Sequence, residues 1–151
     1  MLRAADDRVR FGMQLHRGRL LDHVHLVVAD IAAAKRFYTA ALGALEIPLG
    51  GEAADHVWFD ELFISTTDSQ AAAGQLTGRV HLAFQATSRD AVDRFYAAGL
   101  EAGGRDNGQP GERPYHPGYY AGFLIDPEGN NIEAVYHGPA KASARSIVID
   151  F

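Results

Sequence analysis

The sequence predicts an α+β fold of two tandem β-α-β-β-β modules, whose mixed sheets curl around a shared cleft with the helices outside. Residues 23–42 recur as residues 81–100 at a constant offset of 58, so one structural unit occurs twice. In each copy a strand pattern of period two precedes a helical pattern with one apolar stripe. The repeat also places a histidine, His23 or His81, at the start of both copies, which indicates a pseudo-twofold metal site between the halves.

The opening strand of the first half has one apolar face and one face that carries histidines. Val24, Leu26 and Val28 fall on one side, and His23 and His25 fall on the other. The second half repeats the pattern. We therefore expect the histidines to point away from the core.

A helix follows each opening strand. Asp30 and Ser88 stand directly before the helical patterns and are good N-caps, because their side chains accept hydrogen bonds from the first turn. Gly43 and the pair Gly103–Gly104 are suited to end these helices.

Short extended runs between turn residues complete each half. In the first half they are expected at residues 45–49, 55–59 and 61–66. In the second half a polar loop at 105–118 precedes an apolar run at 119–125, the turn DPEGN and a strand at 131–137.

The length of 151 residues fits one domain with two similar halves. The expected parts are an N-terminal extension (1–19), module one (20–69), a connector (70–78), module two (79–138) and a C-terminal tail (139–151). No stretch has the roughly 20 apolar residues of a membrane-spanning helix, and the first 19 residues lack the apolar core of a signal peptide. We expect a cytoplasmic protein.

The amino-acid composition argues against nucleic acid as a partner and limits the side chains that could bind a metal ion. The net charge of −5 is not gathered into a basic block, which argues against nucleic acid. Because the chain has no cysteine, a metal ion must be held by imidazole and oxygen.

The chain resembles the vicinal oxygen chelate superfamily of glyoxalases, bleomycin-resistance proteins and extradiol dioxygenases. The resemblance is carried by LDHVHLVVADIAAAKRFYTAALG, VHLAFQATSRDAVDRFYAAGLEAGG and RDNGQPGERPYHPGYYAGFLIDPEGNNIEAVYHG, which cover most of residues 20–138. It implies one divalent metal ion, with Fe, Mn, Ni and Zn all possible. By position, the implied ligands are His23, His81 and Glu133.

The residues themselves favour the same ligands. Glu133 alternates with Ile132 and Ala134, so its carboxylate points away from the apolar face. An acid within an otherwise apolar strand needs a partner, and a metal held with two imidazoles supplies one. Two histidines and a carboxylate leave coordination positions open for substrate.

Two positions remain open to alternatives. The tripeptide VHL at 24–26 and 80–82 makes His25 a competitor of His23, although only His23 aligns without a slip of two residues. Matching DELFIS to NNIEAV puts Phe63 at the place of Glu133, where glyoxalase I has a fourth ligand. Glu61 lies two residues earlier, and we interpret it as a solvated charge at a strand end.

The segment YHPGYY enters the cleft and carries candidates for proton transfer, unless it is only a packed turn. The predicted catalytic residues are His116 and Tyr120, and the predicted substrate contacts are His25, Arg113 and Tyr119. Trp58 could line the cleft from the first half, but core packing is its expected use, and His56 and His137 are assigned no role.

These residues predict a metal-dependent enzyme of lyase, isomerase or ring-opening dioxygenase type, acting on a small substrate with two adjacent oxygens. The alternative is a metal-free drug-sequestering protein of bleomycin-resistance type. The alternating tail SARSIVID could add a strand to a neighbouring chain, so we expect a homodimer.

Overall fold

Both modules have the predicted β-α-β-β-β order in the computed structural model, which describes residues 21–72 and 74–141. Module one contains β1 (Val24–Val27), α1 (Ile31–Gly43), β2 (Gly51–Glu52), β3 (His56–Phe59) and β4 (Leu62–Ser65). Module two contains β5 (His81–Gln85), α2 (Arg89–Glu101), β6 (Arg105–Glu112), β7 (Tyr120–Ile125) and β8 (Asn131–Tyr136). The α+β class is confirmed, whereas the N-terminal extension and the strand predicted in the tail lie outside the described residues.

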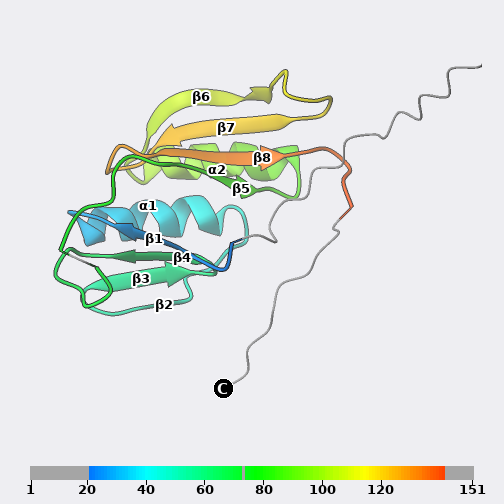
Figure 1. The fold of residues 1–151 in the computed structure, drawn as a ribbon. Coiled ribbons are helices and arrows are strands. Elements are labelled where there is room, and N and C mark those ends of the chain that lie inside the picture. Colours follow the sequence, from blue (N-terminus) through cyan, green and yellow to red (C-terminus); the bar gives the residue numbers. More distant parts are fainter. Residues whose placement is uncertain (1–20, 73, 142–151) are drawn as a thin grey trace, which may run out of the picture.

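Each module forms its own four-stranded mixed sheet (Figure 1). The strand orders are β1-β4-β3-β2 and β5-β8-β7-β6, with the first and last strand of each module paired in parallel. At the outer edge of β1, the Val27 amide donates to Thr77 Oγ1 and the Thr77 amide donates to the Val27 carbonyl. The connector thus borders the edge of the first sheet, and the shared curled cleft stays a prediction.

The helices begin where the N-cap residues predicted. Asp30 accepts a hydrogen bond from the Ala33 amide at 2.9 Å, and Ser88 Oγ accepts one from the Ala91 amide at 3.0 Å. Both caps satisfy amides that lack a partner within the helix. No helix among the described residues is long and apolar enough to span a membrane.

Two predictions of secondary structure were wrong, one of a strand and one of a loop. Residues 45–49 form no strand, because a turn after α1 continues to Glu46 at a positive φ of 63° and the chain becomes extended only at β2. The polar segment at 105–112, interpreted as loop, is the edge strand β6. β6 pairs only with β7, and the register of this pairing shifts along the strand. Both features fit an edge strand that contains Pro110.

The modules meet where α1 packs against α2 (Figure 1). Phe37 of α1 is fully buried and lies against Gly99 of α2. A Cβ at Gly99 would overlap Leu124 and come within 3.3 Å of Phe37. The glycine therefore permits one continuous core across both modules.

The DPEGN turn between β7 and β8 links module two to module one through hydrogen bonds. The buried Tyr38 hydroxyl donates to Asp126 Oδ2 at 2.6 Å. Glu128 Oε1 accepts from the amides of Ala29 and Asp30 at 3.0 and 3.1 Å, at the start of α1. The turn that the sequence indicated is thus also the polar contact between the repeats.

We expect Tyr38→Phe to lower the free energy of unfolding by about 2 kcal/mol, because it removes a buried donor from the Asp126 carboxylate. Urea denaturation followed by circular dichroism would measure this loss. Tyr96→Phe is the matched control, since Tyr96 is the repeat counterpart of Tyr38 but is only partly buried. An equal loss in both variants would contradict the fastening role of Tyr38.

Candidate functional site

Each sheet has one face under its helix and one open face, and the candidate residues gather on the open faces. In module two, register partners across the sheet form the row Ala83, Glu133, Phe123 and Gly108. Strand alternation gives these side chains the same face of the sheet, opposite the helix. The predicted position of Glu133, pointing away from the apolar face, follows from this row.

Glu133 is a buried carboxylate with two partners. It is only 2% exposed. His81 Nε2 donates to its Oε2 at 2.9 Å, and the Tyr119 hydroxyl donates to its Oε1 at 2.5 Å. Burial without these donors would be costly, so the three side chains act as one unit.

The His81 and Glu133 donor atoms suit a divalent metal. Two neighbouring ligands that are each about 2.1 Å from an ion lie about 3.0 Å apart at 90° and about 3.4 Å apart in a tetrahedral site, and His81 Nε2 lies 2.9 Å from Glu133 Oε2. The His81 side chain is half exposed, so an ion can reach Nε2 from solvent. Imidazole and carboxylate are also donors that zinc, iron, manganese and nickel accept.

His116 lies beside this unit and pairs with a second histidine. Its Nδ1 donates to the Pro117 carbonyl at 2.8 Å, and its Nε2 lies 2.9 Å from Nδ1 of His137. The two imidazoles stack at 5.1 Å, and each packs against the Tyr119 ring at 5.3 Å. His137 was missed because a histidine just beyond the final strand has no pattern of its own.

Tyr120, predicted to be catalytic, lies on the opposite side of the sheet from Glu133. Its hydroxyl donates to Asp93 of α2 at 2.7 Å, and the Arg89 guanidinium lies 4.8 Å above its ring. The bond to Asp93, together with burial, raises the pKa of Tyr120. Tyr120 lies three residues before Phe123, the register partner of Glu133, in β7, so alternation places it on the other face of the sheet.

Arg113 remains next to the open face of module two. Its guanidinium lies 5.3 Å from the Phe123 ring, and it donates to the Gln109 carbonyl at 2.7 Å. Phe123 is the register partner of Glu133. Arg113 therefore places a positive charge over the ring beside Glu133 in the sheet.

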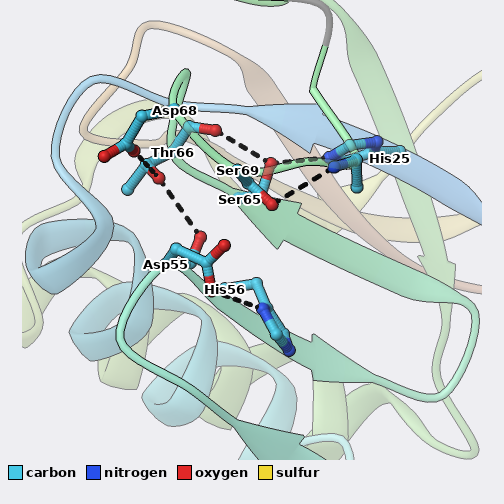
Figure 2. A network of polar contacts seen from close by, with 8 residues as sticks. His25, Asp55, His56, Ser65, Thr66, Asp68 and Ser69 are labelled. Carbon is cyan, nitrogen blue, oxygen red and sulfur yellow. Dashed lines mark hydrogen bonds and ion pairs between the residues drawn. The ribbon is translucent and has the colours of Figure 1, made fainter.

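In module one, His25 is half-buried and His23 is exposed. His25 Nε2 lies 2.8 Å from Ser65 Oγ, and Figure 2 shows the ring directed toward this serine. Burial and, second, the nearby His23 lower the pKa of His25 below 6.5. His23 precedes β1, and its Nδ1 donates to Asp22 at 2.6 Å.

The ladders relate the two modules residue by residue. His25 pairs with Phe63 in module one, and Ala83 pairs with Glu133 in module two. His25 and Ala83 are 58 residues apart and are therefore repeat counterparts. Their strand partners, Phe63 and Glu133, thus occupy equivalent places, as matching DELFIS to NNIEAV predicted. Glu61 is exposed at the turn before β4.

The candidate ligands of the two modules do not converge within this chain. Among residues 21–72 and 74–141, no group of three or more His, Asp or Glu side chains is arranged to hold a metal ion. The structure brings together His81, Glu133 and Tyr119, with His116 adjacent. It leaves His23 and His25 outside this group.

Residues 20–134 match the family model described as the glyoxalase/bleomycin resistance protein/dioxygenase superfamily. The chain belongs to this superfamily. A glyoxalase/bleomycin resistance protein from Albidiferax ferrireducens is 31% identical, with a TM-score of 0.66 over 78% of this chain and 99% of that one. The superfamily therefore accounts for the paired β-α-β-β-β modules.

Solved structures of lower sequence identity share the fold. A lactoylglutathione lyase from Agrobacterium tumefaciens is 20% identical, with a TM-score of 0.57 over 77% of this chain and 92% of that one. A putative glyoxalase from Bacillus halodurans is 24% identical, with a TM-score of 0.58 over 78% and 95%. The comparison with curated proteins gave no match.

Proposed function

We propose that this protein is a metal-dependent enzyme that acts on a small substrate with two adjacent oxygens, in lyase, isomerase or ring-opening dioxygenase chemistry. The observation that carries the proposal is the unit of His81, Glu133 and Tyr119 on an open sheet face. A buried carboxylate beside an accessible imidazole provides metal ligands, and the tyrosine adds a proton donor. Membership of the superfamily supports the same chemistry.

His81 and Glu133 would hold the ion, and a third ligand would come from His23 of a second copy of the chain. His23 is the repeat counterpart of His81, yet it lies outside the His81–Glu133 group within one chain. A homodimer in which module one of each copy faces module two of the other would complete two equivalent sites. When bound, the metal would act as a Lewis acid that polarises the two substrate oxygens.

The chain's own groups would orient the substrate and move its proton. Tyr119 holds a hydroxyl next to Glu133 and is the better proton donor than Tyr120, which lies on the helix side. His116 and His137 pack around the Tyr119 ring and fix its position. Arg113 would attract an anionic group of the substrate.

The third ligand and the dimer can be tested with two complementary variants. His23→Ala and Glu133→Ala should each bind metal poorly as homodimers. A mixed dimer, isolated by two different affinity tags after coexpression, should recover about one metal ion, because one of its two sites then has both ligands intact. Metal content by mass spectrometry and mass by light scattering provide the readout.

The result separates the alternatives. A mixed dimer without metal would show that His23 and Glu133 act within one chain. Retained metal binding in His23→Ala, with loss in His25→Ala, would transfer the third-ligand role to His25. A wild-type protein that takes up no divalent metal would overturn the enzyme proposal in favour of a metal-free binder.

A further inference from the structure

We propose that Asn107, which precedes Gly108 in the edge strand β6, is a site of spontaneous deamidation that the fold slows. Of the asparagines in the chain, only Asn107 precedes a glycine. Asn130 precedes Asn131, and Asn131 precedes the β-branched Ile132. Because glycine has no Cβ, its backbone nitrogen is the least hindered nucleophile for the side chain before it. The modification needs no metal ion and is independent of the proposed enzyme activity.

The reaction needs only water as a co-reactant. The Gly108 nitrogen attacks Cγ of Asn107 to form a cyclic succinimide, and the Cγ–Nδ2 bond breaks. The side-chain nitrogen leaves as ammonia, taking up the proton that the Gly108 amide loses. Water then opens the ring: cleavage of the new N–Cγ bond gives aspartate, and cleavage of the original peptide bond gives isoaspartate. Either product carries one new carboxylate.

Asn107 is accessible and lies at an irregular point of β6. Its side chain is exposed. In the ladder with β7, Asp106 pairs with Leu124 and Gly108 pairs with Phe123, so Asn107 is the extra residue of a bulge. Gly108 has a positive φ of 145°, a conformation that favours glycine. The bulge thus needs the same glycine that makes the preceding asparagine labile.

Two hydrogen bonds keep the reacting groups engaged with other partners in the folded chain. The Gly108 amide donates to Asp106 Oδ1 at 2.8 Å, which holds the nucleophilic nitrogen. Asn107 Nδ2 donates to Asn131 Oδ1 of β8 at 3.0 Å, which holds the side-chain amide. Ring closure has to break both bonds. The reaction therefore proceeds from a locally opened β6, which pairs with only one neighbouring strand.

Conversion of Asn107 changes the open face of module two. Asn131 lies two residues before Glu133 in β8, so the two side chains share a face of the sheet. The bond to Asn131 brings the Asn107 side chain onto the same face. The product lacks the Nδ2 donor of this bond and adds a negative charge to the face that carries Glu133. Chemical ageing of the chain is thereby coupled to the charge of its open face.

Peptide mapping by mass spectrometry would follow the site during incubation at mildly alkaline pH, because replacement of the amide NH2 by OH raises the mass. We expect Asn107 to convert at least about tenfold more slowly in the folded chain than in guanidinium chloride, since the folded chain reacts only after local opening. Asn131 is the internal reference and should convert much more slowly than Asn107 in the unfolded chain.

Asp106→Ala should raise the rate in the folded chain by about two- to tenfold, the scale of one lost hydrogen bond. Asp106→Asn keeps an acceptor oxygen and should convert as slowly as wild type. Gln109→Ala is the matched control, because it truncates an exposed side chain of β6 whose backbone carbonyl, not its side chain, accepts from Arg113. In guanidinium chloride all four chains should convert at nearly the same rate. Circular dichroism would establish that each variant is folded.

No conversion of Asn107 in the unfolded chain would overturn the site, and equal rates in the folded and unfolded wild type would overturn its restraint by the fold. Neither result depends on the folding of a variant. An Asp106→Ala rate equal to that of Gln109→Ala would overturn the role of the Asp106 bond. Because none of these rates requires metal or turnover, a protein that binds no metal would reject the proposed enzyme and leave the modification site in place.

Discussion

Glu133→Gln should lower the affinity for a divalent metal by more than about a hundredfold. Loss of a group that only supports a ligand costs about ten- to a hundredfold, and loss of a ligand itself should cost more. The amide keeps the size of the buried side chain and can still accept the hydrogen bond from Tyr119, so the fold should survive. Isothermal titration calorimetry with zinc or manganese would measure the change.

Glu61→Gln is the control, because it makes the same exchange at the turn before the last strand of the other module. Glu61 is exposed and its backbone carbonyl, not its side chain, accepts from the Val24 amide. The control should leave metal affinity unchanged. A large effect of Glu61→Gln with none for Glu133→Gln would move the carboxylate ligand to module one.

The repeat determined most of what the sequence could predict. An offset of 58 relates His23 to His81 and Asp30 to Ser88, and the two N-caps hold the helices as expected. Matching DELFIS to NNIEAV put Phe63 at the place of Glu133, and the strand ladders agree. Such agreement arises because strand alternation and helix caps are local properties that survive in both copies.

Local patterns failed where an edge or a neighbouring strand decides the structure. The polar residues of β6 show no apolar alternation, because an edge strand needs only one partner and few buried side chains. Trp58 looked like a core residue, yet the glycines of β2 let its ring lie on the open face. Neither feature can be read from one strand alone.

Contacts between the modules were also beyond the sequence pattern. DPEGN predicts a turn in any protein, but its bonds from Tyr38, Ala29 and Asp30 depend on how two repeats pack. The repeat indicated that two histidine-bearing strands should meet at one site. It could not decide whether they meet within one chain or between two, because both arrangements satisfy the same pseudo-twofold symmetry.

Tyr119→Phe should lower the affinity for metal by about tenfold, because the hydroxyl orients the Glu133 carboxylate. In a turnover assay it should also lower kcat by about a hundredfold, the scale for losing a positioned proton donor. Tyr120→Phe is the natural control, since the adjacent hydroxyl bonds to Asp93 on the helix side and should matter for neither quantity.

Comparison of Tyr119→Phe with Tyr120→Phe decides how the segment YHPGYY contributes to function. His116→Gln should leave metal stoichiometry intact and lower kcat less than Tyr119→Phe, because His116 packs on Tyr119 and is not bonded to Glu133. If Tyr120→Phe lost turnover while Tyr119→Phe kept it, the proton would be handled on the helix side of the sheet. That outcome would contradict the open face as the reaction site, because the Tyr119 hydroxyl bonds to Glu133 on the open face and the Tyr120 hydroxyl bonds to Asp93 of α2 on the helix side.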